Sequence, residues 1–285
     1  MLGRWIHKLL CSGVLAGLIT ATVLAFPPGV LADISIHGGK DAYRERLRIL
    51  LKEQWSVEQL ENTDLAITVG LAGLAEFCEN ETETPVLATY LYQSRFAEVA
   101  AQCRQPVVPI FADAPLSSMT LLAEALFPGV DTAMLSTEER ESVPADGQAS
   151  HTLLPVPPEG VARGLGRLID EGHWGVFLLP LDSRVFQATD YQLSLETLFR
   201  HRKPAIVSIH SLLNQGAVAA TYYKPEQLEE AVIRSIKHLM NSGELVGEQP
   251  ERVSVGINKT VLRNLYGRVI TAEELRALEA EVNGG

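Results

Sequence analysis

The chain has 285 residues, enough for one large domain or two modest ones, because one core typically serves about 100 to 200 residues. Hydrophobic residues make up 46% of it and charged residues 21%, which is typical of a globular protein and excludes a disordered or fibrous one. The formal net charge of −11 disfavours nucleic acid and anionic lipid surfaces as partners.

The N-terminus has the pattern of an export signal. Arg4 and Lys8 precede an uncharged run from Leu9 to Phe26. The segment that ends at Ala32 matches the pattern of a signal-peptidase cleavage site. We expect residues 1–32 to be a signal peptide, and a mature protein in the periplasm with 22 basic and 35 acidic residues and a formal charge of −13. Because the apolar run has 18 residues, an uncleaved membrane anchor is the alternative.

The first half of the remaining chain alternates short apolar strands with helices. Strands are expected at 33–39, 64–70, 85–91 and 106–113, and helices at 40–55, 71–80, 93–103 and 114–130. Strands that alternate with helices in this way are typical of a parallel α/β sheet covered on both faces.

The same alternation returns after an irregular segment. Residues 137–158 combine charge, Gly, Ser and several prolines without helical periodicity, and most of this segment is predicted to be loop. Strands are expected at 131–136, 175–182, 204–210 and 252–258, and helices at 159–172, 192–202, 225–243 and in a final stretch rich in Glu, Leu and Ala.

Two cysteines follow the presumed leader, Cys78 and Cys103, and each lies near the end of an expected helix. Such helices can lie side by side and point the same way in a parallel sheet, which would allow a disulfide in an oxidising compartment. Two buried free thiols are the alternative. The cysteine spacing and the scattered histidines do not indicate a metal site.

The motifs of several common enzymes are absent from the sequence. It contains no GxxxxGK[ST] phosphate loop, no GxGxxG turn, no GxSxG nucleophile elbow and no HExxH zinc helix. We therefore predict no catalytic residue, no cofactor and no metal ligand.

Polar turns follow several of the expected strands. Ligands of open parallel sheets bind beyond the carboxyl ends of the strands, where such turns converge. The candidate ligand-binding residues in these turns are His37, Gly38, Gly39, Gly70, Tyr90, Asp113, Asp182, Ser183, His210 and Ser211. Tyr90, Tyr92 and Tyr222 could stack on a flat solute, although ordinary packing explains a tyrosine near a strand end equally well.

Four stretches, in their order, resemble a known family. They are FADAPLSSMTLLAEALFPGV, GVFLLPLDSRVFQ, KPAIVSIHSLLNQGAVAATYYKPEQL and VSVGINKTVLRNL. They are similar to ABC-transporter substrate-binding proteins of the uncharacterised and tryptophan/tyrosine type. This resemblance implies a type I periplasmic-binding fold, an α/β fold with two Rossmann-like lobes and parallel sheets.

The same resemblance implies where the lobes and the cleft lie. Lobe 1 would comprise residues 33–115 and 217–245, and lobe 2 residues 116–216 and 246–285, with GAVAATYY as a crossing between them. The cleft positions of the family correspond to His37 through Lys40, Gly70, Asp113, Asp182 and the pair His210 and Ser211. The chain departs from the family in the irregular segment 137–158 and in a short first unit around KEQWSVEQLENT.

The leading hypothesis is therefore an exported, monomeric solute-binding protein that captures a small molecule and delivers it to a membrane ABC permease. A second hypothesis is an interaction or sensor protein that has kept the scaffold, lost its ligand and binds another envelope protein. A third, an α/β enzyme using Asp182 and His210, has no nucleophile motif to support it.

Overall fold

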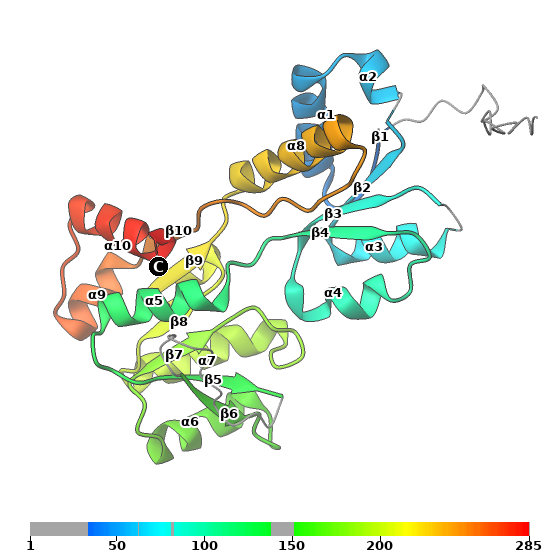
Figure 1. Cartoon of the computed structure of the whole chain (residues 1–285). Coiled ribbons are helices and arrows are strands. Elements are labelled where there is room, and N and C mark those ends of the chain that lie inside the picture. Colours follow the sequence, from blue (N-terminus) through cyan, green and yellow to red (C-terminus); the bar gives the residue numbers. More distant parts are fainter. Residues whose placement is uncertain (1–33, 62, 81–82, 138–150, 285) are drawn as a thin grey trace, which may run out of the picture. The chain divides into compact units, whose positions relative to one another are not determined.

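Two sheets organise the chain, and the first, sheet A, is built from its N-terminal half. The computed structural model describes residues 34–61, 63–80, 83–137 and 151–284, so the expected signal peptide lies outside the described residues. Sheet A contains β1 (Ile34–Gly38), β2 (Leu65–Val69), β3 (Val86–Leu91) and β4 (Val107–Phe111), all parallel and in the order β1-β2-β3-β4 (Figure 1).

Helices cover both faces of sheet A, as a sheet of short apolar strands requires. One face packs against α1 (Asp41–Gln54), α2 (Val57–Glu61) and α8 (Pro225–Ser242). The other face packs against α3 (Gly70–Glu79) and α4 (Gln93–Ala100).

The second sheet, sheet B, follows in the C-terminal half. Its strands are β5 (Thr132–Ser136), β6 (His151–Pro155), β7 (Val176–Leu179), β8 (Ala205–Val207), β9 (Ala219–Tyr222) and β10 (Ser254–Ile257). They lie in the order β10-β9-β8-β7-β5-β6, and all pairs are parallel except β10 with β9. The chain therefore winds outward in two directions from β5 and β7, the arrangement that places ligands at the switch point.

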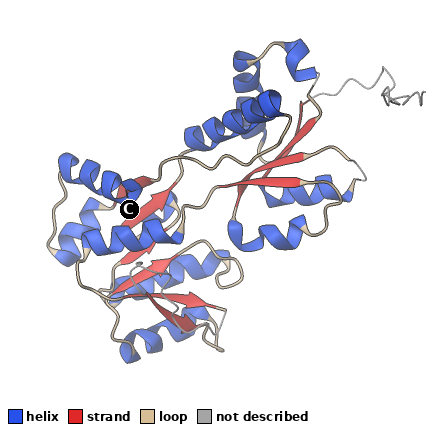
Figure 2. Cartoon of the chain, viewed as in Figure 1, coloured by secondary structure: helices blue, strands red, loops and turns tan. Residues whose placement is uncertain are grey.

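Sheet B is also covered on both faces (Figure 2). One core lies under α6 (Val161–Glu171), α7 (Ala188–Arg200) and the 3₁₀ helix η1 (His210–Gln215). The other lies under α5 (Leu116–Leu126), α9 (Lys259–Tyr266) and α10 (Ala272–Gly284). The α/β fold class and the parallel sheets predicted from the sequence are confirmed.

Within the described residues, sheet A has four strands and sheet B has six. In sheet B, β6 lies outside β5, whereas no described strand lies outside β1 in sheet A. The steps from β1 to β2 and from β2 to β3 run in the same direction, but α1 and α3 lie on opposite faces, so these two crossovers have opposite hands. Parallel crossovers are right-handed in about 98% of cases, and an additional strand outside β1 would remove this conflict. The short first unit noted in the sequence, KEQWSVEQLENT, lies between β1 and β2 along the chain.

Two expectations about individual segments are wrong. Residues 151–155, expected to be loop, form β6 and pair with β5. At the edge of a sheet a strand needs only one hydrogen-bonded neighbour, so Pro155 is tolerated there. The segment GAVAATYY, expected to be a crossing, contains β9, a central strand of sheet B, and the chain leaves for α8 only at Tyr223 and Lys224.

Residues 112–115, 223–224 and 243–253 connect elements of one sheet with elements of the other. The first follows β4, the second precedes α8 and the third follows α8. We call them the three crossings. The division into lobes at residues 115, 216 and 245 stays a prediction.

A disulfide joins Cys78 in α3 to Cys103 just after α4, with 4.7 Å between their Cα atoms. The bond links the two helices that cover the same face of sheet A. This is the side-by-side arrangement expected from the sequence. Among the described helices, none has the length and apolar character needed to cross a membrane.

Candidate ligand-binding site

A pocket of about 390 Å³ joins residues that follow strands of the two sheets. This volume lies within the range of small-molecule sites. Its lining residues are Gln93, Ser94 and Ala97 of α4, Asp113 and Ala114 of the first crossing, Leu116 and Met119 of α5, and Met134, Pro180, Leu181, Asp182, Arg184 and Ser208 of sheet B and its turns. The pocket thus lies at the carboxyl ends of β4, β7 and β8, where the sequence predicted a cleft.

Asp113 contributes a half-buried carboxylate from the first crossing. Its two oxygens accept hydrogen bonds from the backbone N–H of Gln93, the first residue of α4, at 3.1 and 3.4 Å. Burial raises the pKa of Asp113, the hydrogen bond from Gln93 opposes this rise, and the charge of Asp182 adds to it. The protein therefore offsets only part of the cost of burying this charged carboxylate. A hydrogen-bond donor or a cation on a solute would stabilise the charge further.

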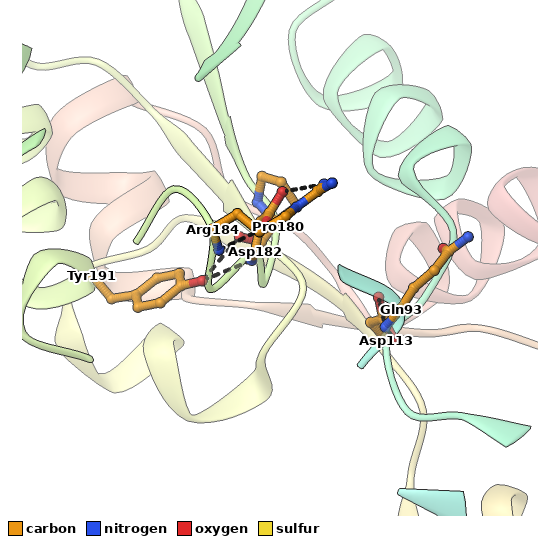
Figure 3. Close-up of polar contacts among 6 residues, drawn as sticks. All are labelled: Gln93, Asp113, Pro180, Asp182, Arg184 and Tyr191. Atoms are coloured by element: carbon orange, nitrogen blue, oxygen red, sulfur yellow. Dashed lines mark hydrogen bonds and ion pairs between the residues drawn. The ribbon is translucent and has the colours of Figure 1, made fainter. Parts of the chain in front are cut away.

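Asp182 is held in place by a neighbouring arginine (Figure 3). Arg184 donates from Nε to Oδ1 at 3.0 Å and from Nη2 to Oδ2 at 2.8 Å, and its backbone N–H donates to Oδ1 at 2.9 Å. Two-point contacts of this kind fix the orientation of a carboxylate. Asp182 therefore presents a rigid polar group at the pocket.

Two hydroxyl groups fasten the turn that carries Asp182. The backbone N–H of Asp182 donates to the Tyr191 hydroxyl at 3.0 Å, and this hydroxyl donates to the Pro180 carbonyl at 3.3 Å. The backbone N–H of Leu181 donates to Ser208 Oγ at 2.8 Å. The turn after β7 is thus preorganised by α7 and by the residue that follows β8.

The charge of Asp113 acts on two tyrosines. Burial raises the pKa of Tyr92 and of Tyr223, and the negative charge of Asp113 raises both further. Both hydroxyls stay protonated at neutral pH and can donate hydrogen bonds. Tyr92 is 42% exposed and belongs to the aromatic residues proposed from the sequence.

The end of β1 and the turn after it, which contain His37, Gly38 and Gly39, pack against neighbouring elements and are not among the described residues that line this pocket. The His37 Nε2 atom lies 2.8 Å from Ser35 Oγ, and the His37 ring packs on Phe77 with 4.8 Å between centroids. Gly38 and Gly39 have φ values of 70° and 68°, which favour glycine. A Cβ on Gly73 of α3 would lie 2.7 Å from the Gly38 Cα. The close approach of α3 to this turn therefore requires glycine at both positions.

The other candidates from the sequence also lie outside the lining, within the described residues. Lys40 is the N-cap of α1, and Gly70 begins α3 with a φ of 76°. Ser183 is exposed in the turn between Asp182 and Arg184. His210 and Ser211 are exposed at the start of η1, and the His210 ring packs on Tyr222 with 4.6 Å between centroids.

Tyr90 faces the core of sheet A because of an irregularity in β3. The register between β3 and β4 shifts between Ala88 and Leu91, and Tyr90 has a φ of 55°, which is uncommon for a tyrosine. Its ring packs on Tyr43 of α1 with 5.0 Å between centroids. Burial raises its pKa, and its hydroxyl has no hydrogen-bond partner among the described residues.

Of the candidates named from the sequence, Asp113 and Asp182 line this pocket together, and most of the other lining residues were not among the candidates. Ser208 was missed because the strand was expected to continue to 210, whereas β8 ends at Val207. An earlier strand end would have indicated Ser208. Gln93 and Ser94 are the first residues of an expected helix, and the hydrogen bond of Gln93 to Asp113 cannot be predicted without the register of β3 and β4. Among the described residues, no cluster of His, Cys, Asp or Glu could hold a metal ion.

Comparisons with known proteins give the fold a precedent. No family model and no curated protein matches the sequence. A ligand-free, open substrate-binding protein with adhesive properties from Clostridium difficile is 12% identical, with a TM-score of 0.60 over 85% of this chain and 97% of that chain. An ABC domain in complex with L-Trp from Streptococcus pneumonia is 16% identical, with a TM-score of 0.56 over 86% of this chain and 98% of that chain.

A third solved structure, a conserved domain protein from Vibrio cholerae, is 14% identical, with a TM-score of 0.51 over 82% of this chain and 81% of that chain. Together with the two sheets and their strand order, these likenesses show that the chain has the type I periplasmic-binding-protein fold. The resemblance stated from the sequence is confirmed at the level of the fold.

Proposed function

We propose that the protein is an exported solute-binding protein of an ABC-type transport system, and that its solute binds in the pocket around Asp113 and Asp182. The observation that carries this proposal is the convergence of these two carboxylates, each from the carboxyl end of a strand in a different sheet, on one pocket. The likeness to a substrate-binding protein and to a domain in complex with L-Trp supports it.

The proposal includes a location and a partner. The leader pattern at residues 1–32 supports export to the periplasm, and a membrane permease would accept the solute there. Binding and delivery require no catalytic group, in agreement with the absence of enzyme motifs from the sequence. We propose that the working unit is a monomer.

A thermal-shift screen tests the proposal. Purified protein would be heated with amino acids, nucleosides, sugars and organic acids, because a ligand of the native state raises the melting temperature by mass action. Asp113→Asn and Ser208→Ala should remove the response to any solute that raises it. Asp131→Asn makes the same charge change at an exposed residue outside the pocket and should leave the response intact.

Two results would contradict the proposal. One is a solute response that survives both pocket variants, which would place the solute elsewhere. The other is silence from all four solute classes with a cooperatively melting sample. Silence would favour the second hypothesis, a scaffold that binds an envelope protein, and cross-linking in intact cells would then search for that protein.

A further inference from the structure

A second pocket, of about 560 Å³, lies where two of the crossings meet α10. It is lined by Lys224 and Gln227 at the start of α8, by residues 251–253 at the end of the third crossing, by Ser254 of β10, and by Arg276, Glu279, Ala280 and Asn283 of α10. The four α10 residues follow helical spacing and so form one face of that helix. None of the lining residues belongs to the pocket around Asp113.

Side chains from two helices fasten the walls of this pocket. Gln227 Nε2 donates to the Arg252 carbonyl at 2.8 Å, and Ser254 Oγ donates to Gln227 Oε1 at 3.1 Å. Asn283 accepts from the Val253 N–H at 2.6 Å and donates to the Val253 carbonyl at 2.9 Å. The end of the third crossing is therefore held between α8 and α10 by hydrogen bonds within the protein.

Three cationic side chains line the pocket from three different segments. Lys224 belongs to the second crossing, Arg252 to the third, and Arg276 to α10. Within the described residues, none of the three forms an ion pair with a carboxylate. The start of α8, which carries the positive end of the helix dipole, adds to the positive potential.

The carboxylates near these cations already have partners. Glu279 Oε1 accepts a hydrogen bond from the Val255 N–H at 3.2 Å, and Glu251 pairs with Arg234 at 3.7 Å. Glu226, next to Lys224 on α8, pairs with Arg46 at 3.0 Å. The lining therefore carries three cationic side chains and two carboxylates, Glu251 and Glu279, a formal charge of 3 − 2 = +1 in a chain whose net charge is −11.

We propose that this pocket binds a small multivalent oxyanion, such as phosphate or a compact polycarboxylate. The guanidinium groups of Arg252 and Arg276 can each donate two parallel hydrogen bonds to such an anion, and Lys224 adds a point charge. An anion in contact with Lys224 and Arg252 links the second crossing to the third. The proposal is independent of the solute in the other pocket.

The test is titration of the purified protein with inorganic phosphate and with citrate at constant ionic strength, with sodium chloride as the reference salt. Both anions should raise the melting temperature in a saturable way that chloride does not reproduce. Arg252→Gln and Arg276→Gln should each weaken the apparent affinity by about tenfold or more, because each removes a charge-assisted contact. Arg263→Gln, which removes an exposed charge on α9 outside the pocket, should leave the affinity unchanged.

Amide hydrogen exchange tests the link between the crossings. Bound anion should slow exchange within residues 243–254 in the parent protein and in Arg263→Gln, but not in Arg252→Gln. Three results would overturn the proposal: chloride acts as well as phosphate and citrate, the control loses as much affinity as the pocket variants, or exchange in the third crossing stays the same at saturation. A cleft solute found in the screen above should still bind all three variants, which separates this site from the proposed function.

Discussion

Removal of the Cys78–Cys103 disulfide should lower the stability of the protein by a predictable amount. The bond closes a loop whose ends are 25 residues apart, and it crosslinks two helices on one face of sheet A. In the chain-entropy description, closing such a loop in the unfolded chain is worth about 3.5 kcal/mol at 25 °C. Replacement of both cysteines by alanine should therefore reduce the free energy of unfolding by about that amount.

The assay is urea unfolding followed by circular dichroism, with and without dithiothreitol. The parent protein should lose stability on reduction, whereas the Cys78→Ala and Cys103→Ala double variant should be insensitive to the reductant. A loss below about 1 kcal/mol, or an equal effect of dithiothreitol on both proteins, would refute the argument that this loop restricts the unfolded chain.

Three further substitutions test the contacts described above. Tyr90→Phe keeps the ring packed on Tyr43 and removes a buried hydroxyl that has no partner among the described residues. The free energy of unfolding should therefore stay the same or increase by up to about 1 kcal/mol. A clear decrease in the free energy of unfolding would show that the hydroxyl forms a hydrogen bond. Gly73→Ala should destabilise the protein by about 1–3 kcal/mol because the new Cβ would meet the backbone of Gly38. Gly166→Ala in α6 adds its Cβ in open space and should stabilise the protein by about 0.5–1 kcal/mol. Equal effects of the two variants on the urea midpoint would contradict this reasoning. Asp113→Asn keeps an acceptor for the Gln93 N–H and removes a carboxyl group whose pKa is raised by burial. The stability of this variant relative to the parent should therefore rise as the pH increases through 3.8, and it should level off above the raised pKa. A stability difference that does not change over this pH range would exclude a cost of burying the charged carboxylate.

The sequence was sufficient for the alternation of strands and helices because each strand is short, apolar and followed by a periodic helix. It was insufficient at sheet edges and at strand ends. The strand at 151–155 ends in a proline and lacks a helical or alternating pattern, and only its pairing with β5 makes it a strand. The segment GAVAATYY looks like a passage of small residues, yet it contains β9, an interior strand that pairs with β8 and β10 and whose Ala219 and Ala220 are fully buried.

The site was predictable to the same extent. A polar residue directly after an apolar strand is visible in the sequence, and Asp113 and Asp182, which line the pocket, were named as candidates in this way. The partners of these residues depend on distances between elements that are far apart in the chain, such as Gln93 with Asp113 or Ser208 with Leu181. His37 followed the same sequence rule and packs on Phe77 instead, because the rule does not distinguish a turn that faces a pocket from one that faces a helix.

The position of β1 at the edge of sheet A, as far as the structure describes the chain, has a mechanical consequence. β1 is the first strand of the described chain and has a single hydrogen-bonded neighbour, β2, whereas β5 in sheet B has one on each side. A pulling force applied at the N-terminus would therefore be resisted at β1 by a single ladder of five residue pairs. If the protein is tethered at that end, β1 is where it would yield first under tension.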